Sequence, residues 1–162
     1  IVDQGYAATA EGTVGAYLEF DNQEANRLGM PLPAGRVRVN QAGPDGSLEF
    51  IGEDLIKHTP RNETLRIKLG ESFDIVGERK QMSFVYDDAA DTITETFEIS
   101  VRNRKREAAE VVVREYLYRW SAWDVTAKSH AFAKRDAQTI DFPVTIPADG
   151  EAKLSYTVRY HW

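Results

Sequence analysis

Cysteine is absent from the 162 residues of this chain, which excludes a disulfide framework, a thiolate metal site and a cysteine nucleophile. Long apolar runs are also missing, because the longest cluster, Val111–Val113, ends at once at Arg114. A transmembrane helix needs roughly 20 apolar residues. An excess of basic residues is the third absence: 26 acidic side chains outnumber 20 basic ones, for a net charge of −6. A general nucleic-acid binder shows the opposite balance. We therefore expect no transmembrane segment and no nucleic-acid partner.

Catalytic signatures are lacking as well. The sequence contains no G-x-S-x-G elbow, no phosphate-binding glycine loop and no dinucleotide-binding glycine pattern. His58, His130 and His161 are too far apart for a local metal motif. Paired carboxylates occur, as they must by chance among so many acids. We expect no catalytic residues and no cofactor, and we favour a non-catalytic protein over an enzyme.

What the chain does contain is β-branched residues. Val, Ile and Thr together account for 33 positions, against 9 for Leu, and such residues pack well on a pleated sheet. Apolar side chains alternate with polar ones along about ten short segments, among them 64–69, 92–103, 139–146 and 152–162. Turn residues such as Gly43-Pro44-Asp45-Gly46 separate them. The pattern predicts an all-β sandwich, immunoglobulin-like in the C-terminal half from Thr92 to Trp162.

The expected organisation is simple. Residues 1–12 are small and polar and indicate a linker or mobile arm. Residues 13–162 form the β-sandwich region, which the turn near residues 88–91 divides, in one interpretation, into two small β units. Pro143 lacks a backbone N–H, so its strand is expected at a sheet edge.

Two charged groups are candidate sites. Asp87, Asp88 and Asp91 offer hard oxygens for calcium, but they lack the spacing of a calcium loop, so a solvated turn is the alternative. The dense basic group is a candidate contact with an anionic surface such as lipid or acidic polysaccharide. We favour a solvated hairpin tip whose charges protect an edge. This basic tip consists of Arg102, Arg104, Lys105 and Arg106.

The aromatic stripe is the third candidate and consists of Tyr116, Tyr118, Trp120 and Trp123. The first three residues share one parity, so a strand would place them on one face. Exposed, the stripe would stack on sugar rings or form a protein interface. Buried, it would fill the core between two sheets, and this commoner use is the one we favour.

Several phrases together resemble a known family. They include residues 29–39 (GMPLPAGRVRV), 48–54 (LEFIGED), 69–79 (LGESFDIVGER) and 146–152 (IPADGEA). Their order and spacing resemble domain-of-unknown-function family 4139, found in exported bacterial proteins, over nearly the whole chain from about Val14. The resemblance implies the C-terminal region of a longer exported chain, located in the periplasm, at the cell surface or outside the cell. It implies no activity and no site residues.

These observations lead to one functional expectation and two alternatives. We expect a non-catalytic structural or interaction module of the bacterial cell envelope, which assembles through strand or edge pairing. Its partner is then a protein, either a second copy or an upstream domain of the same precursor. The first alternative is a carbohydrate-binding module that uses the aromatic stripe as its platform. The second is a hydrolase whose carboxylates converge only in the fold.

Overall fold

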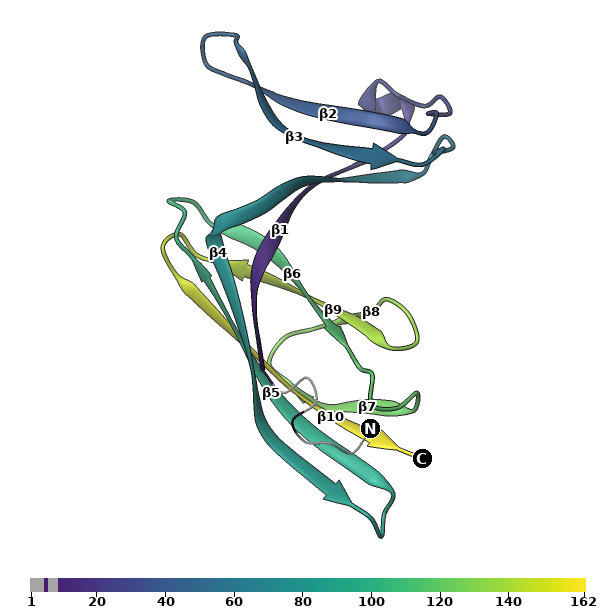
Figure 1. Ribbon diagram of the computed structural model, residues 1–162, viewed down its shortest axis with the longest axis vertical. Helices are drawn as coiled ribbons and strands as arrows, with labels where there is room; N and C mark the ends of the chain where they lie inside the picture. The colour runs from purple at the N-terminus through teal and green to yellow at the C-terminus, as the bar shows by residue number, and fades with distance from the viewer. Residues whose placement is uncertain (1–4, 6–8) are drawn as a thin grey trace. The chain divides into compact units, whose positions relative to one another are not determined.

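Strands dominate the chain. The computed structural model describes Gly5 and residues 9–162, and the all-β prediction is confirmed for these residues (Figure 1). One short 3-10 helix, η1 (Glu24–Asn26), accompanies the strands, and no helix among the described residues is long and apolar enough to cross a membrane. The strands are β1 (Thr9–Asp21), β2 (Gly35–Ala42), β3 (Leu48–Ile56), β4 (Thr64–Asp87), β5 (Thr92–Asn103), β6 (Ala109–Tyr116), β7 (Trp123–Lys128), β8 (Ala133–Lys134), β9 (Thr139–Ile146) and β10 (Glu151–His161).

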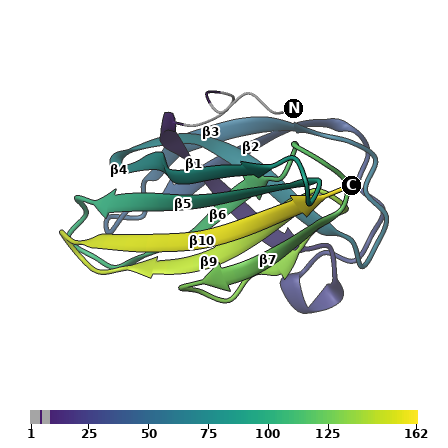
Figure 2. The same cartoon turned by 90° about the horizontal axis from the view of Figure 1, so that it is seen from below.

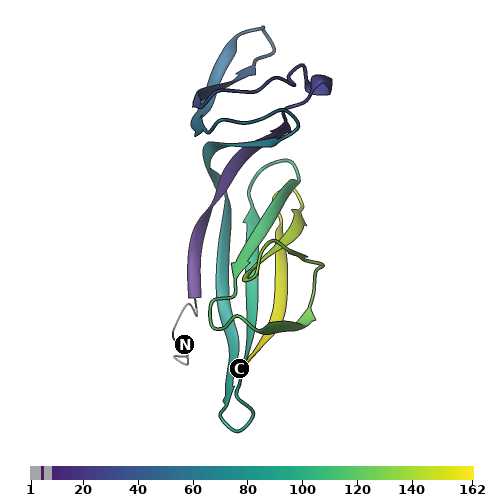
Figure 3. The ribbon, with the colours of Figure 1, turned by 90° about the vertical axis from the view of Figure 1, so that its right-hand side faces the viewer.

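The chain forms two compact units. Unit 2 is the continuous segment from Val14 to Ser72, and unit 1 combines the residues before it with the segment from Phe73 to Trp162. Both boundaries fall inside strands, so β1 and β4 contribute residues to each unit. The expected division near residues 88–91 is not where the units separate. Those residues form the turn of the β4–β5 hairpin, whose last pair joins Asp87 to Thr92 (Figure 3).

Unit 1 is a two-layer sandwich. One layer has the strand order β1-β4-β5-β10-β7 and the other the order β6-β9-β8, with antiparallel pairing between β4, β5, β10 and β7 (Figure 2). The layers meet at aromatic rings: Phe142 of β9 lies 5.5 Å from Tyr156 of β10, ring centre to ring centre. Buried residues, most of them apolar, alternate with more exposed ones along β5 and β10, as a sheet with one buried face requires. The sandwich prediction is confirmed, and its immunoglobulin-like detail stays a prediction.

Unit 2 contains the expected half-buried hairpin. Strands β2 and β3 pair antiparallel with a bulge beside Val39. Val37 and Val39 are half-buried, whereas Arg36 and Arg38 of the opposite face are exposed. The hairpin lies so close to β4 that a Cβ on Gly52 would stand 2.5 Å from the carbonyl oxygen of Leu69. Glycine is therefore the residue that permits this contact.

Two further expectations, the linker at residues 1–12 and the edge position of Pro143, can be compared with the structure. Of the expected linker at 1–12, residues 9–12 belong to strand β1, so the linker prediction is wrong for them, and residues 1–4 and 6–8 lie outside the described part. Pro143 lies on β9, between β6 and β8, but β8 pairs only with Ile140 and Asp141. At Pro143 itself, β9 therefore has a single neighbour, β6, which suits a residue without an N–H.

Candidate binding face

A row of exposed aromatic side chains crosses unit 1. Tyr116 of β6 and Tyr118 lie with ring centres 6.4 Å apart and planes inclined by 12°. In the connection to β7, Trp120 lies 5.9 Å from Trp162, which follows β10. Trp162 in turn stacks on Tyr86 of β4 at 6.2 Å and 15°. We call these five residues the aromatic row. It starts on the three-stranded layer and ends on the five-stranded one.

The side chains of the aromatic row are about half exposed. Tyr116 is 52% exposed, Tyr118 42% and Trp120 45%. The shared parity of these three residues is therefore confirmed, but the preferred interpretation that they fill the core is wrong. The core position is taken by the alternate residues Leu117 and Arg119, which are 1% and 4% exposed. An apolar residue and a paired charge thus replace the rings inside the sandwich.

Arg119 makes a buried bidentate ion pair with Glu95 of β5. Its Nε lies 2.7 Å from Oε2 of Glu95 and its Nη2 lies 2.7 Å from Oε1, with both side chains 2% exposed. Gln81 of β4 donates a third hydrogen bond to Glu95 at 2.7 Å, and Phe84 offers its ring face to the guanidinium at 4.9 Å. Such geometry compensates the cost of removing both charges from water. It also fixes the backbone between Tyr118 and Trp120.

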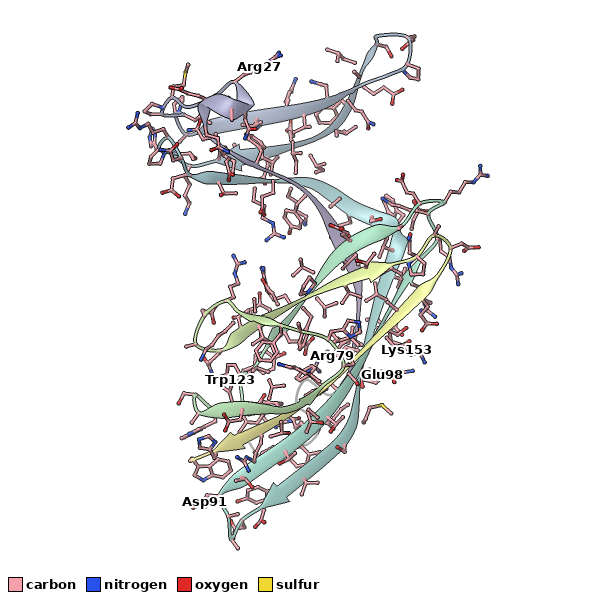
Figure 4. All side chains as sticks on the ribbon, turned by 180° about the vertical axis from the view of Figure 1, so that it is seen from behind. Arg27, Arg79, Asp91, Glu98, Trp123 and Lys153 are labelled. Atoms are coloured by element: carbon pink, nitrogen blue, oxygen red, sulfur yellow. The ribbon has the colours of Figure 1, made fainter. Side chains whose placement is uncertain are left out.

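A second buried ion pair holds the other end of the segment. Nε of Arg79 lies 2.8 Å from Oε2 of Glu115, and the hydroxyl of Tyr156 donates to the same oxygen at 2.6 Å. The guanidinium of Arg79 also covers the ring of Phe97 at 3.7 Å. Figure 4 shows Arg79 between the two layers, whereas Glu98 and Lys153 point off the opposite face of the sheet. Burial raises the pKa of the Tyr156 hydroxyl far above its usual range, and the Glu115 carboxylate raises it further. Tyr156 therefore remains a neutral donor.

Backbone contacts complete the support of the segment. The N–H of Leu117 donates to the carbonyl of Gln138 at 2.7 Å, and the Gln138 side chain donates back to the carbonyl of Leu117 at 3.2 Å. Inward anchors therefore alternate with outward rings from Glu115 to Trp120, although the last regular strand residue is Tyr116. The arrangement holds exposed aromatic rings on a backbone that is fixed from beneath.

Trp123 does not belong to this row. Its indole Nε1 donates to the carbonyl of Ala137 at 2.9 Å, and the Nζ of Lys134 lies 4.7 Å from the ring centre. Figure 4 shows it at the start of β7. Trp123 therefore ties β7 to the loop before β9. The structure thus pairs Tyr116 with Tyr118 and places Trp120 against Trp162, which in turn contacts Tyr86.

The basic tip lies at the end of β5. Arg102 and Arg106 are exposed, and Arg104 lies 3.3 Å from Asp149. Lys105 is half-buried, and its backbone N–H donates to the side chain of Asn103. A surface hollow here is lined by Arg104, Lys105 and Arg106 together with the carboxylates of Asp74 and Glu107. The mixture of signs agrees with a solvated tip, and contact with an anionic surface stays a prediction.

The carboxylates of Asp87 and Asp88 in the acidic turn accept local hydrogen bonds. Asp87 accepts from the N–H groups of Ala89 and Ala90 at 3.1 Å, and Asp88 accepts from the Tyr86 hydroxyl at 2.6 Å. Asp91 adopts a left-handed backbone, with φ of 50°. Within the described part of the chain, no group of three or more metal-ligating side chains is positioned to hold an ion. The calcium interpretation of Asp87, Asp88 and Asp91 therefore gains no support.

Sequence reasoning missed the two buried ion pairs and the far end of the row. A signal for Glu95 was present, because it shares the parity of Ile93 and Phe97 in a strictly alternating segment. Tyr86 and Trp162 carried no such signal. Trp162 contacts both Tyr86 and Trp120, and it meets Tyr86 only through the register of β4, β5 and β10, which sequence spacing does not contain.

Comparison of the chain with protein-family models, curated proteins and solved structures gave no match. The resemblance to family 4139 thus stays a prediction, and the function has to be argued from the geometry of the chain itself.

Proposed function

We propose that the chain is a non-catalytic interaction module of an exported bacterial protein, located in the cell envelope or outside the cell, which joins copies of itself by pairing at a sheet edge. One observation carries this proposal. Strand β1 is 13 residues long, and in the strand order of its sheet it has one neighbour, β4. An edge strand presents unpaired N–H and C=O groups on which a second chain can build. The resemblance to family 4139 supports the exported setting.

Within the two sheets of unit 1, the other edge strands are better protected than β1. Strand β8 has only two residues, and β9 beside it carries Pro143. Strand β6 carries Arg114, and β7, with six residues, ends at Lys128. Proline, basic side chains and short length are the usual means of preventing edge-to-edge association. The sequence of β1 contains no proline, lysine or arginine, so we assign the pairing edge to this strand.

Two neighbouring proline substitutions test the edge. Successive residues of an edge strand direct their N–H groups alternately toward the neighbouring strand and away from it. Of the pair Ala10→Pro and Glu11→Pro, one variant therefore removes only an outward N–H, and the other removes one that faces β4. We expect the first to keep its unfolding midpoint and become monomeric, and the second to unfold more easily.

Sedimentation of the full chain over a concentration series measures the outcome. The wild type should associate reversibly, and deletion of residues 1–12 should give monomers. A wild type that stays strictly monomeric at every concentration contradicts the proposal. So does association that survives both proline substitutions and the deletion.

A further inference from the structure

The aromatic row points to a ligand as well as to a surface. We propose that it binds an uncharged glycan chain, whose sugar rings stack on the exposed faces of Tyr116, Tyr118, Trp120, Trp162 and Tyr86. This inference goes beyond edge pairing and uses a different part of unit 1, so either proposal can fail alone.

The composition of the row suits sugar rings. All five side chains are aromatic, and three of them carry a hydroxyl group. Aromatic side chains are enriched at protein interfaces as well, so the row alone does not distinguish the two kinds of partner and the glycan test below does. Exposed Val85 alternates with Tyr86 along β4 and therefore points to the opposite face of the strand, whereas exposed Val112 lies on the face of Tyr116, four residues before it on β6. Aromatic rings with a polar tip suit a ligand with apolar C–H faces and a polar rim, as sugar rings have.

The charges beside the row favour an uncharged ligand. At the Tyr86 end, the carboxylate of Asp88 accepts from the Tyr86 hydroxyl, and the carbonyl of Asp91 accepts from the N–H of Trp162 at 3.3 Å. At the Tyr116 end, Arg114 makes a bidentate pair with Asp141 at 2.8 and 2.9 Å, and Arg135 lies 3.5 Å from the same carboxylate. The carboxylate at the Asp88 end disfavours an anionic chain there, whereas sugar hydroxyl groups can donate to these acceptors.

Spacing and rigidity favour an extended chain of repeated rings. The ring centres of Tyr116 and Tyr118 are 6.4 Å apart, and Trp162 lies 5.9 Å from Trp120 and 6.2 Å from Tyr86, so successive rings within these two groups have similar spacing. The buried pair of Arg119 and Glu95 and the second pair at Glu115 hold the backbone beneath these faces. A surface that is already ordered loses little conformational entropy on binding.

A glycan array with immobilised neutral and anionic oligosaccharides tests the full chain, followed by calorimetry on the best neutral hexasaccharide. We expect binding to neutral glycans, weakened about tenfold or more in Trp120→Ala and in Trp162→Ala. Phe73→Ala is the matched control, because Phe73 is 93% exposed and lies outside the row. Its affinity should equal that of the wild type. Unfolding curves of all three variants verify that they fold.

Several outcomes would overturn the assignment. These are the absence of neutral glycans among the ligands, a preference for anionic glycans, and affinity that survives both tryptophan substitutions. Loss of self-association in Trp120→Ala would identify the row as a protein interface instead. The proline variants of β1 separate the two proposals, because they should alter mass in sedimentation and leave glycan affinity unchanged.

Discussion

At the scale of single residues, burial of charge is the dominant feature of unit 1. Glu95 and Arg119 are almost inaccessible, and Glu115 and Arg79 nearly so. Buried pairs of this kind seldom add net stability over apolar residues of similar volume, but removal of one partner is costly. Both pairs lie beneath the aromatic row, and we infer that they hold the row in place.

Arg119→Met should therefore lower the free energy of unfolding by about 3–5 kcal/mol, because it leaves the Glu95 charge buried without its cation. Urea denaturation measures the loss. Arg36→Ala is the control: Arg36 is 58% exposed beside Glu53, and its loss should cost less than about 1 kcal/mol. The double variant Glu95→Leu/Arg119→Met should recover much of the stability. Failure of the double variant to recover any would contradict the compensation argument.

Asp141 makes stability depend on pH. Hydrogen bonds from Arg114 hold the pKa of its carboxyl below the ordinary value of 3.8, against an opposing effect of burial. A carboxyl whose pKa is lowered by folding stabilises the protein above its unfolded pKa, and this contribution disappears as pH falls through the folded pKa. We expect Asp141→Asn to be less stable than the wild type at neutral pH and the difference to shrink below pH 3.8. Chemical denaturation across this range measures it, and a difference that grows in acid would refute the assignment.

Individual residues also show how much of the structure can be predicted from the sequence. Alternation correctly placed Tyr116, Tyr118 and Trp120 on one side, because the period of a strand is independent of tertiary structure. Which side faces the core was decided by Arg119, whose partner Glu95 lies 24 residues away on β5. Hydrophobicity alone favoured burial of the rings, since it cannot anticipate that a paired arginine occupies the interior.

At the scale of elements, buried asparagines organise the turns. Asn22 is fully buried, and its amide donates to the carbonyls of Met30 at 2.7 Å and Pro60 at 2.9 Å. Asn103, also fully buried, donates to the carbonyls of Glu107 at 2.8 Å and Pro147 at 3.1 Å. Each side-chain amide thus supplies loop carbonyls with the hydrogen-bond donor that a neighbouring strand would otherwise provide. Polar residues in loops gave no sign of this role in the sequence.

Asn103→Ala should destabilise unit 1 by about 2 kcal/mol, because the buried or part-buried carbonyls of Glu107, Ile146 and Pro147 lose their donor together. Thermal unfolding followed by circular dichroism measures the loss. The control is Asn40→Ala, at an exposed position in β2. Asn62→Ala is less suitable, because Asn62 has a left-handed backbone with φ of 65°. Equal effects of Asn103→Ala and Asn40→Ala would show that the buried contacts contribute nothing.

Glycines in the β2–β3 hairpin provide a matched pair for its packing. Gly52→Ala places a Cβ 2.5 Å from a backbone oxygen of β4, whereas a Cβ on Gly35 meets nothing within 4 Å. We expect Gly52→Ala to cost about 1–3 kcal/mol and Gly35→Ala to stay within about 0.5 kcal/mol of the wild type. Denaturant midpoints compare the two variants, and equal midpoints would contradict the close approach.

At the scale of the whole molecule, the two units differ in their cores. Fully buried apolar residues of unit 2 are Leu65 and Ile67, whereas unit 1 buries a long series on both layers, including Phe97, Phe142 and Tyr156. A unit of about 60 residues buries a smaller fraction of its surface than a larger one and is correspondingly less stable. The sequence predicted the strands and the sandwich, but not this division, because the boundaries lie within uninterrupted strand patterns.

Hydrogen exchange should therefore distinguish the units. We expect amides of β2 and β3 to exchange with a lower opening free energy than those of β5 and β10. Gly52→Ala should speed exchange in β2 and β3 and leave β5 and β10 unchanged, as measured by mass spectrometry of peptic fragments. Uniform acceleration across both units would mean that they unfold as one.

The contact between Trp120 and Trp162 has an optical consequence. Two indoles 5.9 Å apart and inclined by 56° couple their electronic transitions, so the wild type should show a split exciton band in circular dichroism. Trp120→Phe and Trp162→Phe should each abolish the band, while Trp123→Phe should keep it. Because the two indoles belong to different segments of unit 1, the same band reports whether those segments stay together as the protein unfolds.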